Sequence, residues 1–540
     1  MNFFINSSYN EQNSGIEHAQ IKRSLLFRKN KTPFKLLFLA WNPLLHHYLN
    51  QKNIKDIEIL NVFDYFQNTE QVVSKKIYYS DIDFGVSNLK YNEEKDKNRY
   101  IVFQDNNIVG RINYFPKKIS NDKQVKSVEY FDGFGNLYRV DFYDLRGFVS
   151  LVQWYTPDNK IGTEVWYSID GRPVVETYHR KNALGELKKS GWKTISPNGT
   201  VKIFDTLSDV FLQFFNEIND KYFDKSEPNI FIMDRSDDVE EQLQLLNQPA
   251  FTALHLHNSH AGDAQKPDTS ILNNNYEYSL NDINRYDAVI SATHKQTDDV
   301  IKRFHPLAKT FTIPVGVIPD NHFNKKEIPM NERKFGQILV TARIAPEKQL
   351  DQLIRAIGIA KKTIPELSLD MYGYIDHSNN DIAMKKINKA IDEYNLKDCV
   401  HIHSYVQNVA KVQKEAQVYG LTSVMEGFNL ALMEAMSQGD IGLTYDVNYG
   451  PNELVKDQVN GYVVDYGDYK TMAQRLITIF SNKDLMDKLS KNAYHYSKRY
   501  SEDSVWQDWK DFLDFAKEDW INHKMKNYKP DITNGIQKLD

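Results

Sequence analysis

The stretch from residue 129 to residue 178 alternates short β-forming runs with turn signals, and this regularity constrains the fold more than any other feature. Runs such as LYRVDFY and TEVWYSI alternate apolar or aromatic residues with polar ones, as half-buried strands do. Turn signals separate the runs every 12 to 14 residues, at Asp132-Gly133, Asp144 to Gly147, Asp158-Asn159 and Asp170-Gly171. This pattern predicts an antiparallel meander of hairpins, with about five or six strands between residues 100 and 203.

The pattern changes to α/β on both sides of the meander. PFKLLFLAWN, AFTALHLH and QILVTAR are nearly continuous apolar runs, and they alternate with helical segments such as QLDQLIRAIGIAKKTI. Continuous apolar strands between helices indicate parallel sheets that are covered on both faces. We therefore expect an α/β protein with two doubly wound, Rossmann-like lobes, in which ligands bind at the carboxyl ends of the strands.

A chain of 540 residues is too long for one hydrophobic core, and the changes of pattern suggest where it divides. Trp506, Trp509 and Phe512 lie on one face of the last helix, which we expect to pack back on the lobes, followed by a polar tail after Asn527. The expected parts are an N-terminal lobe in two pieces (1–75 and 208–318), the inserted β-meander (76–207), a C-terminal lobe (319–500), and the last helix with the tail (501–540).

The composition argues against several classes of protein. A formal net charge of −5 argues against a general nucleic-acid binder. Cys399 is the only cysteine, which excludes an internal disulfide and fits a reducing compartment. The first residues lack the features of a signal peptide, and no apolar run approaches the roughly 18 residues that a membrane span needs. We expect a cytoplasmic protein without a transmembrane segment, and peripheral contact with a membrane stays open.

The stretch SVMEGFNLALMEAMS, residues 423–437, places two glutamates around a helix start. Gly427 permits backbone angles that other residues resist, Asn429 suits an N-cap, and Gly439 suits a helix stop. Glu426 then lies in the loop before the helix and Glu434 on its second turn. Free N–H groups at the helix start attract phosphate, and carboxylates accept hydrogen bonds from hydroxyls, so a sugar nucleotide would meet both. An ordinary strand–helix unit with a surface glutamate fits the spacing equally well.

Two cations flank another turn in the same lobe. Arg343 and Lys348 follow the predicted strand QILVTAR, so they are expected at its carboxyl end. Two cations at this place suit a diphosphate, which arginine can bind with two parallel hydrogen bonds. Two unrelated surface cations are the alternative. Near the start of the chain, Gly15 precedes a predicted helix and would let a backbone N–H approach a ligand, although an ordinary helix start explains it as well.

The stretch HLHNSHAGD contains three histidines that allow three interpretations. His255, His257 and His260 follow the HxHxxH spacing of some metal ligands, but Ser259 replaces the aspartate of the HxHxDH motif in binuclear metallohydrolases. The histidines could also be buried packing groups at a strand end. The interpretation we favour is a catalytic role on the acceptor side of a cleft, without a metal.

Taken together, these motifs resemble a known family. Arg343 with Lys348, and Glu426 with Glu434, on the second of two doubly wound lobes, look like the retaining family 4 glycosyltransferases of GT-B fold. DVNYGPNELV, GIEHAQIKRSLLFRK and the inserted meander narrow the resemblance to the bacterial subgroup that glycosylates serine-rich or serine–aspartate-rich surface proteins and wall teichoic acid. One departure is Asn429, which stands where the family usually has a second glycine.

The resemblance implies a role for each residue of the site. Arg343 and Lys348 would neutralise the leaving diphosphate of a UDP-sugar, so no metal or other cofactor would be needed. Glu426 would hold sugar hydroxyls and Glu434 the ribose. His260, with His257 as the alternative, would lie beside the anomeric carbon. The remaining donor-binding residues implied are Gly15, Gly316, Tyr405, Asn429 and Leu430.

The resemblance also implies substrates and partners. The expected reaction moves a sugar, GlcNAc in preference to glucose, from UDP to serine hydroxyls of a serine-rich surface protein. One alternative acceptor is poly(glycerol or ribitol phosphate) of wall teichoic acid, and one alternative function is that of an inactive co-glycosyltransferase subunit. We expect a homo-oligomer assembled through the meander, and the resemblance leaves room for a partner glycosyltransferase subunit. A zinc-dependent metallohydrolase is the rival outside this family.

Overall fold

The computed structural model describes residues 1–235, 239–404, 406 and 408–528. The chain forms two compact units. The first contains Met1–Asn13 and Pro33–Ala250, and the second contains Ser14–Thr32 and Phe251–Asp540. The predicted polar tail falls almost entirely on residues 529–540, outside the described part. Within the described residues, no helix combines the length and the apolar character that crossing a bilayer requires.

The first unit begins with a small parallel sheet. Strand β1 pairs in parallel with β14 and β2, and β2 pairs in parallel with β3. Phe3, Phe4, Leu36 and Leu37 are fully buried, as expected for strands covered on both faces. The strands are β1 (Asn2–Asn6), β2 (Phe34–Phe38), β3 (Ile59–Asn61) and β14 (Ile230–Met233), and the helices are α2 (Leu45–Asn50), α3 (Val62–Phe66) and α4 (Leu207–Lys221).

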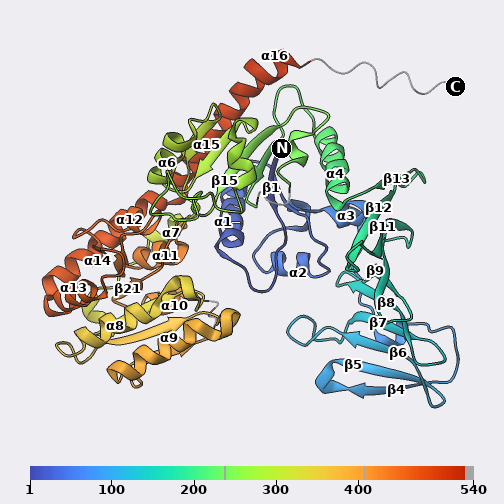
Figure 1. Cartoon of the computed structure of the whole chain (residues 1–540), viewed down its shortest axis with the longest axis horizontal. Coiled ribbons are helices and arrows are strands. Elements are labelled where there is room, and N and C mark those ends of the chain that lie inside the picture. Colours follow the sequence, from blue (N-terminus) through green and yellow to red (C-terminus); the bar gives the residue numbers. More distant parts are fainter. Residues whose placement is uncertain (236–238, 405, 407, 529–540) are drawn as a thin grey trace. The chain divides into compact units, whose positions relative to one another are not determined.

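A ten-stranded antiparallel sheet fills the rest of this unit, with its strands in chain order from β4 to β13 (Figure 1). The prediction of five or six strands was wrong. From β7 onward the strands start 11 to 14 residues apart, so more of them fit into the segment than were predicted. They are β4 (Leu89–Glu94), β5 (Arg99–Gln104), β6 (Asn107–Tyr114), β7 (Val125–Phe131), β8 (Leu137–Asp144), β9 (Phe148–Tyr155), β10 (Ile161–Tyr167), β11 (Pro173–Lys181), β12 (Leu187–Ile195) and β13 (Val201–Phe204).

Buried polar contacts join this sheet to the parallel sheet. Arg146, in the turn between β8 and β9, forms ion pairs with Asp144 at 2.8 Å and with Asp64 of α3 at 3.0 Å. Gln67 donates from Nε2 to the carbonyl oxygens of Ser150 and Tyr167. Because these groups are buried and paired, removing one partner would leave the other unsatisfied, so the junction is held in one geometry.

The second unit contains two further sets of parallel strands. Strands β15 (Phe251–Leu256), β16 (Ala288–Ser291) and β17 (Lys309–Thr312) pair in that order. A six-stranded sheet follows, in the order β20-β19-β18-β21-β22-β23. Its strands are β18 (Gln337–Thr341), β19 (Ser368–Tyr372), β20 (Val400–His403), β21 (Val418–Leu421), β22 (Ile441–Tyr445) and β23 (Gly461–Val464).

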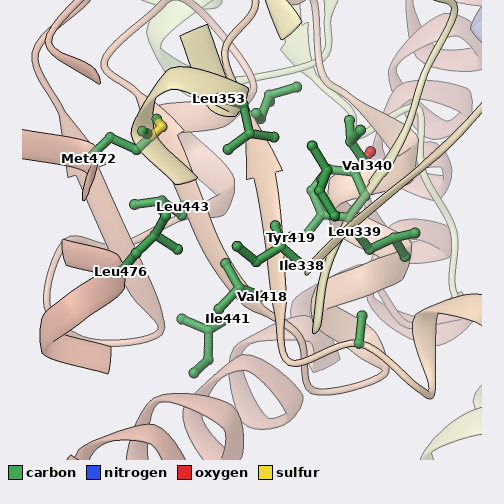
Figure 2. Close-up of a cluster of buried hydrophobic side chains, with 14 of the residues drawn as sticks. Ile338, Leu339, Val340, Leu353, Val418, Tyr419, Ile441, Leu443, Met472 and Leu476 are labelled. Atoms are coloured by element: carbon green, nitrogen blue, oxygen red, sulfur yellow. The ribbon is translucent and has the colours of Figure 1, made fainter. Parts of the chain in front are cut away.

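Helices cover the six-stranded sheet and enclose its core. Figure 2 shows Ile338, Leu339 and Val340 of β18 beside Leu353 of α8 and Val418 of β21, all of them buried. The covering helices include α8 (Leu350–Ala360), α9 (Ser378–Tyr394), α10 (Val409–Gln413), α11 (Leu430–Ser437), α13 (Tyr469–Ser481) and α14 (Lys483–Ser497).

The last long helix, α15 (Glu502–Asp519), packs on the first helix of the same unit, α1 (Gly15–Lys29). The ring of Phe27 contacts Trp506 and Trp509 with centroids 5.4 and 5.5 Å apart. Phe512 packs against Phe251 of β15 at 5.9 Å. The aromatic face of α15 therefore holds α1 and β15 together.

Candidate active site

Two loops meet at one edge of the six-stranded sheet, because β18 and β21 are neighbouring parallel strands. The loop after β18 carries Arg343 and Lys348, and the loop after β21 carries Glu426. Thr422 Oγ1 donates to the carbonyl oxygens of Lys348 and Gln349, both at 3.0 Å. These hydrogen bonds hold the two loops together independently of the side chains predicted to form the site.

Lys348 and Glu426 form the central ion pair of this edge. Lys348 Nζ lies 2.7 Å from Glu426 Oε1, and Ser423 Oγ donates to the same oxygen at 2.6 Å. The side chains of Lys348 and Glu426 are only 19% and 12% exposed. The structure thus brings one predicted cation directly against one predicted acid, and an ion pair shielded from water is screened much less than an exposed one.

Arg343 lies nearer the surface than Lys348. Its Nη1 is 2.7 Å from Asp376, its Nη2 contacts Glu347, and 41% of its side chain is exposed. Two carboxylates therefore compete for a guanidinium that the sequence assigned to a diphosphate. Since a guanidinium has five N–H donors, a bound diphosphate would either share it with these carboxylates or displace one of them.

Helix α11 starts as the sequence predicted. Asn429 has φ of +75° and its side chain accepts a hydrogen bond from the Leu432 N–H at 2.8 Å, which confirms the N-cap. Asparagine tolerates this left-handed conformation better than most residues, so it can stand where the family has a glycine. Leu430 is the first helical residue, Glu434 lies on the second turn, and Gly439, with φ of +88°, follows the helix end. The open N–H groups of the first turn face the end of the helix where Glu426 lies.

Gly427 is required for a different reason from the one expected. It does not adopt a positive φ, but a Cβ at this position would lie 2.1 Å from the carbonyl oxygen of His257. Gly450 is similar, because its Cβ would lie 1.7 Å from the carbonyl oxygen of Phe428. The loop that holds Glu426 is thus pressed between two other segments of backbone, and close approach explains both glycines.

Lys22 of α1 completes the surroundings of Glu434, and the sequence reasoning did not find it. Its Nζ lies 2.9 Å from Glu434 Oε1 and donates to the carbonyl oxygen of Val317 at 3.1 Å. The neighbouring Gly316 lies so close to Met433 of α11 that a Cβ would meet its Sδ at 2.3 Å. The available signal was that Lys22 follows Gly15 by seven residues, which places both on one face of a helix.

Gly15 itself is the first residue of α1. Ser14 caps the helix, and its hydroxyl and backbone N–H both donate to the carboxylate of Glu17 in a capping box. A Cβ on Gly15 would meet no atom within 4 Å, so the space beside it is open. Tyr405, the remaining predicted donor-binding residue, lies outside the described residues.

The three histidines of HLHNSHAGD lie in three different settings. His255 Nδ1 is 3.0 Å from the Arg23 guanidinium, and the ring lies 4.2 Å from that of His257. His257 is half-buried, and its carbonyl oxygen lies beside Gly427. His260 is fully buried and stacks on Tyr449, with its Nε2 3.3 Å from the carbonyl oxygen of Pro267. The Arg23 guanidinium engages His255 Nδ1 and the Pro267 carbonyl engages His260 Nε2, so these two ring nitrogens are not open to a metal ion.

Burial lowers the pKa of His260 to about 4, so its imidazole is neutral at pH 7. The nearby carbonyl oxygen can only accept, which places the proton on Nε2. Its Nδ1, 3.4 Å from the Tyr449 hydroxyl, then accepts. Burial also raises the pKa of Tyr449, so that hydroxyl keeps its proton and can donate to Nδ1. In this structure His260 can hold the chain around Tyr449 through neutral hydrogen bonds.

The lowered pKa predicts a pH dependence of stability. Unfolded histidine binds a proton below about pH 6.5, whereas folded His260 stays neutral down to about pH 4. The folded state therefore loses up to about 3 kcal/mol relative to the unfolded state as the pH falls through this window. We expect His260→Gln to flatten the rise of the thermal unfolding midpoint between pH 4.5 and 7. His495→Gln, at an exposed position of α14, is the control, and equal slopes for both variants would contradict the assignment.

Comparison with known proteins gives two family matches. Residues 320–496 match the model described as glycosyl transferases group 1, which covers the six-stranded sheet and its helices. Residues 91–191 match the model described as GtfB middle domain, which covers most of the ten-stranded sheet. The first match lies within the second compact unit and the second match within the first unit.

Similar proteins cover nearly the whole chain. The GtfA subunit of a UDP-N-acetylglucosamine–peptide N-acetylglucosaminyltransferase from Streptococcus agalactiae is 27% identical over 93% of this chain and 96% of its own length. A poly(glycerol-phosphate) alpha-glucosyltransferase from Bacillus subtilis is 24% identical over 94% of this chain and 74% of its own. The crystal structure of the pneumococcal O-GlcNAc transferase GtfA with UDP and GlcNAc superposes with a TM-score of 0.80 at 21% identity, covering 95% of this chain and 98% of that one. A likeness at this level establishes a common fold.

Proposed function

This chain is a GT-B glycosyltransferase of the serine-rich-protein and teichoic-acid type, as its sequence predicted, and we propose that it transfers GlcNAc from UDP-GlcNAc to serine hydroxyls of a serine-rich bacterial surface protein. The observation that carries this proposal is the start of α11, where Lys348 pairs with Glu426 on one side and Glu434 pairs with Lys22 on the other. Cations, free N–H groups and carboxylates therefore lie together at the start of this helix. A sugar nucleotide needs the first two for its phosphates and the carboxylates for its hydroxyls.

The donor would be bound by charge and by hydrogen bonds to its hydroxyls. Lys348 and Arg343 would neutralise the diphosphate, and the N–H groups from Leu430 onward would bind its oxygens. Glu434 would accept hydrogen bonds from the ribose through the oxygen that Lys22 leaves open. Glu426, fixed by Lys348 and Ser423, would hold hydroxyls of the sugar.

Catalysis would then depend on stabilising the leaving group. As the bond from the anomeric carbon to the diphosphate breaks, negative charge grows on the phosphate oxygens, where Lys348 and the N–H groups of α11 would stabilise it. The serine hydroxyl would attack on the face that the diphosphate leaves, giving retention without a carboxylate nucleophile. Of the two histidines proposed beside the anomeric carbon, His257 is the more accessible, while His260 would act through Tyr449 and the surrounding chain.

We propose that the reaction needs no metal, because side-chain cations and a helix start would take the place of a divalent ion at the diphosphate. Turnover should therefore be unchanged by an excess of EDTA, measured as UDP release. Loss of activity on chelation that zinc restores would instead support a metallohydrolase built on the histidines. Elemental analysis of the purified protein provides an independent check.

Glu434→Ala should weaken UDP binding by roughly tenfold or more, since it removes a charged acceptor of ribose hydrogen bonds. Lys22→Met should weaken it only about threefold, because a partly exposed ion pair contributes little by itself. Titration calorimetry with UDP measures both. Glu366→Ala, exposed on the same lobe, is the control, and an unchanged UDP affinity in Glu434→Ala would remove the ribose role.

The acceptor and the sugar need a direct test, because the Bacillus subtilis relative glycosylates poly(glycerol phosphate). UDP-GlcNAc and UDP-glucose are each offered with a serine-rich polypeptide and with poly(glycerol phosphate), and the products are identified by mass spectrometry. We expect GlcNAc on the polypeptide. Sugar on the polyol phosphate alone would make the chain a teichoic-acid glycosyltransferase, and no product with any pair would favour an inactive subunit.

A partner subunit and self-association both fit the meander. The related streptococcal enzyme is itself described as a subunit, and the meander matches a GtfB middle domain. The end strands β4 and β13 each have one unpaired edge within the sheet, and such edges accept further strands. We propose a homo-oligomer formed through this sheet, with light scattering as the test. If the protein is a monomer at micromolar concentration, the proposed homo-oligomer is wrong, and the sheet would be left to bind a different partner chain.

A further inference from the structure

A basic pocket lies at the far end of α11 from the candidate active site. It is an open hollow of about 540 Å³, a volume that includes part of the surrounding solvent, and its lining includes Gln438, the residue after the helix end. Helix α11 has eight residues, so its two ends are about 12 Å apart. A ligand in this pocket would therefore not overlap a nucleotide at the start of the helix.

The lining of the pocket is strongly cationic. Four lysines, Lys325, Lys326, Lys414 and Lys498, share the lining with a single carboxylate, Glu327. In the described part of the chain, none of the four forms an ion pair. Lys325 and Lys414 also help to lower the pKa of His322 in the same lining, after the larger effect of burial. The positive charge of the lysines therefore acts on a side chain of the pocket lining, His322, and not only on the solvent around the pocket.

The lysines are not needed to cap α11. A helix end attracts cations because its last carbonyl groups lack partners. Here those carbonyls are already bound: Ser437 accepts from His322 Nε2 at 2.7 Å, Gln438 accepts from the buried Arg333, and Gly439 accepts from Ser490 at 2.7 Å. Capping therefore leaves the four ammonium groups unexplained.

Tyr494 adds a fixed hydroxyl to the lining. Its oxygen accepts hydrogen bonds from the Ile328 N–H at 3.1 Å and from Arg333 Nη2 at 3.0 Å. Both lone pairs of the oxygen are then engaged, so its own proton is the group that it can offer to a ligand. A donor hydroxyl among ammonium groups suits an oxyanion.

We propose that this pocket binds the phosphate group of a phosphate ester, at a site separate from the donor nucleotide. Lysine binds phosphate as a point charge, and several lysines around one cavity favour a group with one or two negative charges. The hollow is open to solvent, so the glycerol-like part of an ester can extend outward from the bound phosphate. The ester could be a soluble molecule or the headgroup of an anionic lipid.

The test uses the full chain with saturating UDP, which occupies the donor site. Binding is measured by calorimetry with glycerol 3-phosphate, and by co-flotation with vesicles of phosphatidylglycerol or phosphatidylcholine at constant ionic strength. The variant Lys325→Gln/Lys414→Gln/Lys498→Gln removes three charges from exposed positions, and Lys385→Gln/Lys386→Gln/Lys389→Gln on α9 removes the same charge elsewhere. Thermal unfolding checks that both variants fold.

We expect the pocket variant to lose at least about tenfold in affinity and the α9 variant to stay within about twofold of the unchanged protein. Binding of glycerol 3-phosphate identifies a soluble ester, and binding to phosphatidylglycerol vesicles alone identifies a headgroup. Binding to neither ligand, or an equal loss in both variants, overturns the proposal. Because no turnover is measured, the result is independent of the reaction proposed above.

Discussion

Lys348→Ala should lower the turnover number by about 10²-fold or more, the usual effect of removing a group that stabilises a leaving anion. Lys348 is the better shielded of the two cations and is held at 2.7 Å by Glu426, so its charge is screened little by water. Arg343→Ala should have an effect of the same order, since it removes charge from the same diphosphate. Steady-state kinetics with a fixed acceptor and varied UDP-sugar measures both.

Lys397→Ala is the matched control, because Lys397 is an exposed lysine of the same lobe paired with Asp392. It should retain full activity. If Lys348→Ala and Arg343→Ala also stay within about threefold of the unchanged enzyme, far less than such a group normally contributes, then the diphosphate does not lie between the two loops.

Glu426→Gln should lower kcat by roughly 10²-fold while changing the KM for the donor much less, because its contact to the sugar must persist as the bond breaks. The same substitution removes the counter-ion of Lys348. The double variant with Lys348→Ala should therefore lose much less than the product of the two single losses, since the residues act as one unit.

Glu415→Gln, at an exposed position on the same lobe, controls for the change of charge. A Glu426→Gln enzyme with a raised KM and an unchanged kcat would show that Glu426 serves binding alone. Fully multiplicative losses in the double variant would show that the 2.7 Å pair has no importance for the reaction.

Local signals predicted the start of α11 correctly. Asn429, the good helix formers after it and Gly439 act over one or two turns, so the sequence is sufficient to predict them. Gly427 shows the limit of this reasoning. The residue was correctly singled out as special, but the reason is the backbone of His257, which is distant in sequence, and no local pattern indicates such an approach.

Lys22 and Asp376 contact the site but were not found from the sequence, and the reason is again an approach by a segment that is distant in the chain. Lys22 reaches Glu434 because α15 and the 316–317 segment hold α1 in place, and Asp376 reaches Arg343 from the loop after β19, the strand next to β18. Each pairing depends on tertiary packing between segments far apart in sequence. The number of strands in the meander was wrong for a different reason. The strands from β7 to β13 start 11 to 14 residues apart, as the turn signals indicated, but the predicted count was too small for that spacing.

The ten-stranded sheet of the first unit has a consequence for how such proteins diverge. Each strand pairs only with its neighbours in the chain, so the sheet can grow or shrink by one hairpin without rearranging the rest. Its contacts are local, which favours rapid and independent formation during synthesis. The sheet can therefore lengthen or shorten in steps of two strands, whereas the loop that holds Glu426 lies against the distant backbone of His257 and is far less free to change.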